Sequence, residues 1–141
     1  MAVKDFVYDK RLVTLETLAE ILRKNWVGFE DLHTMVCKSN HKYGNDDAET
    51  DRYAKALAAY FSSKVNNRPN ARGGVYKAFM HSAMQFVWQG EKTGATPDGR
   101  YDGGEISKNA SPSVGMDKNG VTALINSAYG IDKFGIQNNS V

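Results

Sequence analysis

Apolar residues recur with a helical period in four segments of this chain, so the hydrophobic pattern predicts a mainly helical unit. The predicted helices span about 14–25, 30–38, 46–65 and 120–129. In the first of them the apolar positions fall on one face, at Leu15, Leu18, Ala19 and Leu22. Thr14 precedes this face as a helix N-cap, because its hydroxyl can accept a hydrogen bond from a backbone N–H of the first turn.

The third predicted helix has the strongest start signal. Asp46 is expected to cap it, with Glu49 three residues later as the partner of a capping box. Its buried face is expected to be marked by Tyr53, Leu57, Tyr60, Phe61 and Lys64/Val65. The acidic residues around its start complement the helix dipole and lack the pattern of a calcium loop, so no metal site is predicted there.

The segment 75–89 changes period. Its even positions from Tyr76 to Trp88 are nearly all apolar and its odd positions are mixed, which predicts an extended segment with one face against helices. A continuous helix over 75–88 is the alternative, because Met, Ala and Gln favour helix. An unpaired apolar strand is an association hazard, so either self-association through this segment or its conversion to helix is expected of the isolated chain.

Thr93 to Gly120 shows neither period and is predicted to be a long irregular loop. Loops of this length within a compact domain are usually functional or disordered. Asp98 is expected to accept hydrogen bonds from backbone N–H groups of its own turn, and Arg100 to hold a carboxylate or carbonyls. Asp117 is the third residue expected to have a structural role in this loop.

Five segments, in one order along the chain, carry a resemblance to a known family. They read GFEDL at 28–32, KYGNDDAETD at 42–51, NARGG at 70–74, TGATPDGR at 93–100 and SPSVGMDKNGVTALINS at 111–127. Together they resemble the glycyl radical enzymes, the pyruvate formate-lyase-like family. The stretch EISKNASPS at 105–113 differs from the GEPLADG-like version of many members, which weighs against pyruvate formate-lyase itself.

The resemblance implies an α+β fold class, a mainly helical fragment of an α/β barrel, with residues 1–141 as a single piece of that barrel domain. It makes 75–89 a barrel strand whose lumen face would present Ala83, Gln85 and Val87 to substrate. The alternative for Gln85 is a hydrogen bond to a neighbouring backbone group. The turn at 96–100 would tie its loop to the barrel, so that a buried radical site stays closed.

The two reactive residues that the resemblance calls for do not match this sequence. The radical glycine of the family lies in an Arg-Val-x-Gly-Tyr-type motif, and neither Gly130 nor Gly135 has that context. Cys37 lies on a predicted helix instead of a cysteine loop and is expected to be structural. No catalytic residue is therefore assigned, and the chain is expected to be inactive on its own.

The parent implied by the resemblance cleaves C–C, C–O or C–N bonds in anaerobic metabolism and is formate acetyltransferase-like or a related dehydratase. No cofactor is expected in this chain; the parent would carry a glycyl radical installed by a radical SAM activase. The implied partners are that activase and the remainder of the parent chain. The alternative function is a small non-catalytic interaction or complementation module.

Composition and net charge exclude several other classes of function. A formal net charge of +2 is too small to indicate a nucleic-acid partner or an anionic membrane. The chain has no apolar run of about 18 residues for a membrane span and no apolar stretch near its start for a secretory signal. One cysteine fits a reducing, cytoplasmic setting, and the three histidines lack the close spacing of a zinc site.

Overall fold

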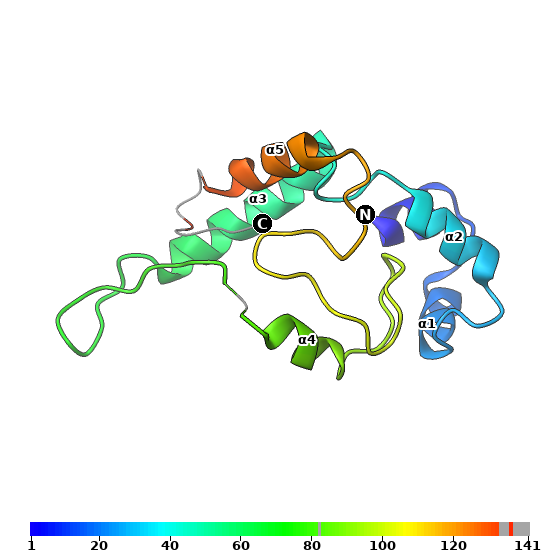
Figure 1. Ribbon diagram of the computed structural model, residues 1–141, viewed down its shortest axis with the longest axis horizontal. Coiled ribbons are helices and arrows are strands. Elements are labelled where there is room, and N and C mark those ends of the chain that lie inside the picture. Colours follow the sequence, from blue (N-terminus) through cyan, green and yellow to red (C-terminus); the bar gives the residue numbers. More distant parts are fainter. Residues whose placement is uncertain (82, 133–135, 137–141) are drawn as a thin grey trace.

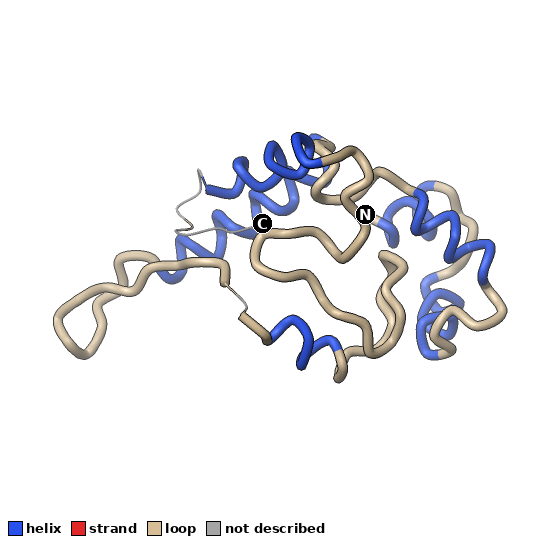
Figure 2. The backbone as a smooth tube through the Cα atoms, in the orientation of Figure 1, coloured by secondary structure: helices blue, strands red, loops and turns tan. Residues whose placement is uncertain are grey.

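The computed structural model describes residues 1–81, 83–132 and 136, and in this part of the chain the regular structure is helical (Figures 1 and 2). The helices are η1 (Lys4–Asp9), α1 (Leu15–Arg23), α2 (Glu30–Lys38), α3 (Ala48–Val65), α4 (Gln85–Gly90) and α5 (Val121–Asp132). The four helices that the hydrophobic pattern predicts are all present. The N-terminal helix η1, a π-helix, was not predicted.

Local capping chemistry sets two of the helix starts. The N–H of Thr17 donates to the Thr14 hydroxyl at 3.1 Å, as expected of an N-cap. The cap of α3 is Asp47, whose carboxylate accepts from the N–H of Thr50 at 2.8 Å, so the assignment of this cap to Asp46 was wrong by one residue. The helix α5 continues to Asp132, beyond the predicted end at 129, so this predicted boundary was also wrong.

The predicted extended segment at 75–89 was wrong over its second half. Gln85 to Gly90 form α4, and Ala83 precedes it with φ of 43° in a turn. The continuous-helix alternative was wrong as well, because residues 75–80 are not helical. A strand needs a neighbour to accept its backbone hydrogen bonds, and the antiparallel bridge between Pro69 and Val75 is an isolated bridge outside any strand.

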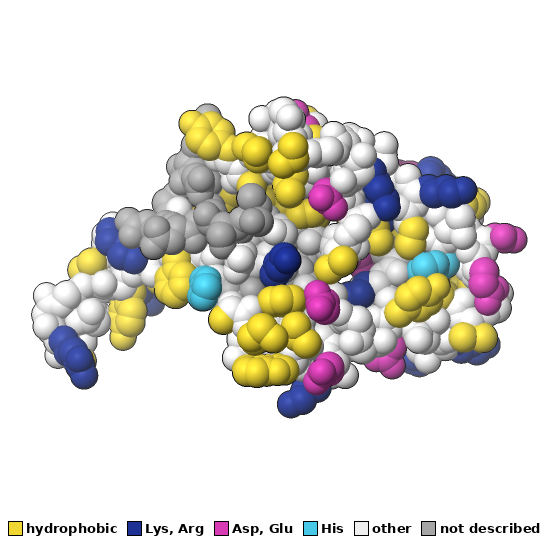
Figure 3. All heavy atoms as spheres, viewed as in Figure 1, with side chains coloured by type: hydrophobic (Ala, Val, Ile, Leu, Met, Phe, Trp, Pro, Cys, Tyr) yellow, Lys and Arg dark blue, Asp and Glu magenta, His cyan; other side chains and the backbone are white. Residues whose placement is uncertain are grey.

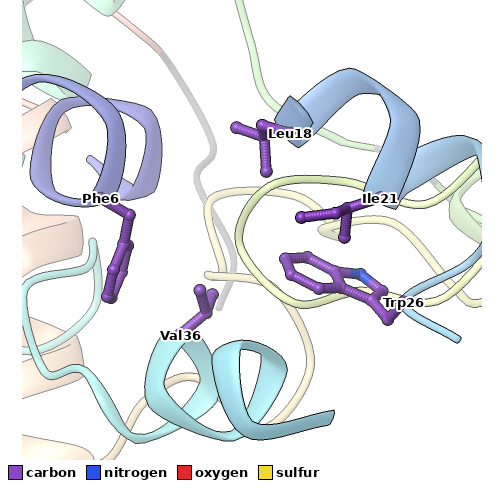
Figure 4. Packing of buried hydrophobic residues seen from close by; sticks show 5 residues of the cluster. All are labelled: Phe6, Leu18, Ile21, Trp26 and Val36. Atoms are coloured by element: carbon purple, nitrogen blue, oxygen red, sulfur yellow. The ribbon is translucent and has the colours of Figure 1, made fainter. Parts of the chain in front are cut away.

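Large apolar side chains from η1, α1, α2 and the turn after α1 converge in one closed core. They belong to Phe6, Leu18, Ile21, Trp26 and Val36 (Figure 4). Ala95, from the long loop, packs against the same core. The core therefore joins the N-terminal helices to a loop that lies far from them in the sequence.

A second apolar cluster lies where α3 and α5 pack on each other. Its buried members are Ala58, Ala78, Ile131 and Ile136. The face of α3 buried along this side holds mostly small or polar residues, Thr50, Asp51, Ala58 and Ser62. The predicted buried face was therefore wrong for Tyr53, Leu57, Tyr60 and Phe61, whose side chains are exposed. Val65, at the end of the helix, does pack against this cluster.

A hairpin-like segment projects from the C-terminal end of α3 and is called the arm here (residues 66–80; Figure 1). The N–H of Tyr76 donates to the carbonyl of Arg68 at 2.9 Å, and the N–H of Asn67 donates to the carbonyl of Tyr76 at 3.0 Å. At the tip, the Asn70 side-chain oxygen accepts from the N–H groups of Arg72 and Gly74. The arm is thus an internally hydrogen-bonded projection.

Candidate functional site: the anchored loop

The long loop from Thr93 to Gly120 passes between α4 and the N-terminal helices (Figure 1). It has no regular secondary structure of its own, so most of its backbone groups depend on turns and side chains for hydrogen bonds. Five groups of contacts hold it, and each involves a buried or half-buried polar side chain.

Asp98 closes the turn at 96–100 and ties it to a later part of the loop. Its carboxylate accepts hydrogen bonds from the hydroxyls of Thr96 and Ser113, each at 2.5 Å. Burial by itself would raise the pKa of the Asp98 carboxyl. The hydrogen bonds from Ser113, Thr96 and backbone N–H groups outweigh burial and hold that pKa below its ordinary value.

Arg100 holds four carbonyl groups around the same turn. One guanidinium nitrogen donates to the carbonyls of Gly104 at 2.6 Å and Tyr101 at 3.1 Å. The other donates to the carbonyls of Thr93 at 3.0 Å and Gly94. The planar, multiple-donor geometry of arginine suits this arrangement, and it gathers backbone groups that no helix or sheet would satisfy.

Lys42 joins the loop to the end of α2. Its ammonium group donates to the carbonyls of Val36 at 2.7 Å and Asp98 at 2.9 Å, and to the Met116 sulfur at 3.0 Å. All three donors of the amine are therefore used. The residue is buried, and desolvation lowers the pKa of the Lys42 amine.

Asn45 anchors the far end of the loop. Its amide nitrogen donates to the carbonyls of Met116 at 2.8 Å and Lys42 at 3.1 Å. Its side-chain oxygen accepts from the N–H of Asn119 at 3.0 Å, and the Asn119 amide donates back to the Asn45 carbonyl at 2.9 Å. Asn45 is 3% exposed, so this reciprocal pair is shielded from water.

His33, on α2, contacts the opposite side of the 96–100 turn. Its Nε2 lies 2.8 Å from the Gly99 carbonyl oxygen, and its ring lies between those of Trp26 and Tyr101, with centroids 5.1 and 4.5 Å away. Gly99 has φ of 103°, and a Cβ there would lie 2.6 Å from the Cys37 sulfur. A side chain at 99 would therefore collide with α2.

A hollow of about 520 Å³ opens beside the anchored loop. Its walls include Lys42 and Asp98, and residues of α3 from Thr50 to Leu57. A neighbouring hollow of about 450 Å³ is lined mostly by apolar side chains of α3, the loop and the C-terminal segment. Both hollows are open, so neither is a closed chamber in which a reactive intermediate would be protected from water.

The residues predicted from the sequence are divided between the loop and α4. The structure brings Asp98 and Arg100 together in one turn, whereas Asp117 is exposed further along the loop. Ala83 and Gln85 are exposed and Val87 is partly buried, around α4. The last two lie on a helix, so the three no longer share the face that alternation in a strand would give them.

Sequence reasoning missed Lys42, Asn45 and His33 as loop anchors. A single lysine, asparagine or histidine has no periodic pattern that predicts a contact more than 50 residues away. One signal was available, because Lys42 and Asn45 both lie in the KYGN segment that carries the family resemblance.

Charged side chains also meet at the start of α3. The His41 Nδ1 lies 3.0 Å from the Asp5 carboxylate, and its Nε2 lies 3.5 and 3.4 Å from Asp47 and Glu49. Within the described residues, no group of three or more His, Cys, Asp or Glu side chains is arranged to hold a metal ion. No helix among the described residues is both long and apolar enough to span a membrane.

The family description "Pyruvate formate lyase-like" matches residues 1–90 of this chain. The chain is 34% identical over 131 residues to trans-4-hydroxy-L-proline dehydratase of Clostridioides difficile, which covers 93% of this chain and 17% of the relative. It is 31% identical over 143 residues to isethionate sulfite-lyase of Bilophila wadsworthia, covering 96% of this chain and 16% of that protein.

The fold matches a solved structure over the same extent. The crystal structure of the C. difficile hydroxyproline dehydratase with its substrate bound aligns with a TM-score of 0.86 at 31% identity. The alignment covers 98% of this chain and 18% of the solved one. The chain thus spans less than one fifth of the length of these relatives. Sequence and fold agree in their conclusion: the chain belongs to the pyruvate formate lyase-like family of glycyl radical enzymes.

Proposed function

We propose that this chain is a structural part of a larger glycyl radical dehydratase or lyase and does not turn over substrate by itself. One observation carries the proposal. The loop that bears the family motifs is anchored by Lys42, Asn45, Asp98 and Arg100, in a chain that spans 17% of its relative's length. Such anchoring suits a wall that must keep its shape around a reaction carried by other residues.

The residues 1–141 act as one piece of the barrel domain in this proposal. The arginine-valine-x-glycine-tyrosine motif of the radical site does not occur in the sequence. The only cysteine, Cys37, lies on α2 beside His33 and Gly99, where it fills space. The remaining polypeptide would supply the glycyl radical and the thiol, and a radical SAM activase would install the radical.

The relatives favour one reaction type over another. Their names describe a dehydratase and a sulfite-lyase, and both cover more than nine tenths of this chain. A dehydratase or lyase is therefore the preferred parent, ahead of a formate acetyltransferase. The substrate contact of Ala83, Gln85 and Val87 stays a prediction from the resemblance alone. The strand face that suggested it is not present, since Gln85 and Val87 lie on α4.

The second candidate is a small complementation module, a separate chain that completes a partner enzyme. The exposed apolar face of α3 is the observation behind it, because a large exposed apolar patch marks an interaction site and a separate partner chain can cover it as well as a joined one. In both cases this chain supplies structure and the partner supplies the reactive groups.

The test is a fusion in which this chain replaces the 131 matched residues of the C. difficile hydroxyproline dehydratase. After treatment with the activase of that enzyme, the fusion is expected to show a glycyl radical by electron paramagnetic resonance, and the isolated chain is expected to show none. An insoluble fusion, or a radical on the isolated chain, would contradict the proposal. The unaltered dehydratase, activated in parallel, is the control for radical yield.

A further inference from the structure

The stretch from Arg52 to Lys77 combines large exposed apolar side chains with an excess of positive charge. On α3 the apolar side chains follow each other at helical spacing and form what is called the stripe here: Tyr53, Leu57, Tyr60 and Phe61, with 52%, 70%, 64% and 47% of their surface exposed. They are the largest apolar side chains of that helix, and none of them belongs to a buried core. Contiguous exposed patches of this kind usually mark interaction sites.

Two hollows border the stripe, so the surface around it is not flat. The two, of about 520 and 450 Å³, share Tyr43, Ala54 and Leu57 in their walls, together with Ser107 and Ser111 of the long loop. Leu57 therefore stands between two open depressions, and each of them could receive side chains from a partner. Apolar side chains that fill such depressions contribute most of the energy of typical interfaces.

The stretch of chain that carries the stripe and the arm has charged side chains of one sign. No Asp or Glu occurs between Arg52 and Gly90, so all 16 acidic residues lie elsewhere in the chain. The basic residues of this stretch are Arg52, Lys55, Lys64, Arg68, Arg72 and Lys77. In Figure 3 the projecting arm shows dark-blue and yellow side chains and none in magenta. The ammonium of Lys64 lies 5.3 Å from the Tyr60 ring centroid, so cations border the stripe itself.

We propose that the stripe and the arm form the surface on which the remaining polypeptide of the enzyme packs, through an apolar segment bordered by acidic side chains. The inference rests on the proposed function and identifies the surface that it requires. The relatives are about six times longer than this chain, so most of their polypeptide lies outside the matched part and is available to cover this face. The border of the covering segment should be acidic, because it would face the basic residues of this surface.

The fusion described above provides the test, with Leu57→Asp as the main variant. In the isolated chain, this substitution at an exposed position should leave the thermal unfolding midpoint unchanged. In the fusion, where the stripe is covered, it should reduce the soluble yield at least about tenfold, because a charge would be buried at the centre of an interface. Arg68→Glu together with Arg72→Glu should reduce that yield by a smaller factor.

Val27→Asp is the matched control, because Val27 is 68% exposed and lies in the turn after α1, outside the stripe. It should leave both proteins unchanged. Equal yields of the unaltered and Leu57→Asp fusions would overturn this inference and leave the proposed function standing, whereas an insoluble unaltered fusion would overturn both. A discrete dimer of the isolated chain that Leu57→Asp dissociates, and Val27→Asp does not, would assign the surface to a second copy instead.

Discussion

The two halves of this molecule use their large apolar residues in opposite ways. In the half built by η1, α1 and α2, Trp26, Ile21 and Val36 are each at most 2% exposed and form a closed core. In the half built by α3, α5 and the arm, the buried cluster consists mainly of alanine and isoleucine, and the aromatic side chains of α3 face outward. The first half thus resembles the interior of an independent domain.

This difference shows where the chain can stand alone and where it needs more polypeptide. A closed core gains its stability from contacts within the chain, whereas an exposed stripe gains stability only when something covers it. The long loop connects the two halves through buried hydrogen bonds at Lys42 and Asn45. Substitutions in the core, at the connection and on the stripe should therefore have effects of decreasing size in the isolated chain.

Trp26→Ala should have the largest effect, because it removes the largest side chain of the closed core. We expect the free energy of unfolding to fall by about 3–5 kcal/mol, measured by urea denaturation and circular dichroism. The Trp26 indole N–H has no hydrogen-bond partner among the described residues. Trp26→Phe, which keeps an aromatic ring and loses no hydrogen bond, should therefore cost less. Equal losses for the two variants would show that the core does not depend on ring packing.

Asn45→Ala should have the second-largest effect. It removes three buried hydrogen bonds and leaves the carbonyls of Lys42 and Met116 without that donor. We expect a loss of about 2–3 kcal/mol in the free energy of unfolding, together with faster amide hydrogen exchange at 116–119. Asn40→Ala, at an exposed position two residues before Lys42, is the control and should change neither measurement.

Asp98→Asn should cost about 1–2 kcal/mol of unfolding free energy at pH 7, because the carboxylate accepts two charge-assisted hydrogen bonds. The folded state holds the pKa of Asp98 below its ordinary value of 3.8. The stabilisation by the carboxylate is therefore complete above that value and is lost as the pH falls through the lower, folded pKa. The difference between the two proteins should thus be constant at pH values well above 3.8 and should shrink as the pH falls below that value. A difference that does not shrink on acidification would exclude this role.

Leu57→Ala should have the smallest effect. Its side chain is 70% exposed, so we expect a change of at most about 0.5 kcal/mol in the unfolding free energy of the isolated chain. A loss as large as that of Trp26→Ala would mean that the stripe is already covered in the isolated protein. That result would remove the contrast between the two halves.

Four of the helices, α1, α2, α3 and α5, could be predicted because their signals are local. Thr14 caps α1 through a hydroxyl three residues from its donor, and α2 has the bounds that its apolar pattern predicts. The 93–120 loop was predicted for the same reason, since Gly, Pro and Asp set backbone angles without reference to the rest of the chain. The turn roles of Asp98 and Arg100 follow from side-chain chemistry within a few residues.

Contacts between distant segments could not be predicted. Alternation over 75–88 predicted a strand, but a strand forms only beside a neighbour, and α4 formed instead. The apolar residues of α3 predicted its buried face, but α5 packs against the small residues on another side of the helix. Periodicity identifies the residues that share a face but not the element that covers it.

The sequence by itself determined four of the helices, the irregular loop and the family, because each depends on residues close together or on motifs in a given order. The tertiary structure decided that Lys42 and Asn45 hold the loop and that Tyr53, Leu57, Tyr60 and Phe61 face outward. The physical reason is that burial and buried hydrogen bonds are properties of pairs of segments. Their partners are set by how the whole chain, and whatever polypeptide covers it, packs in three dimensions.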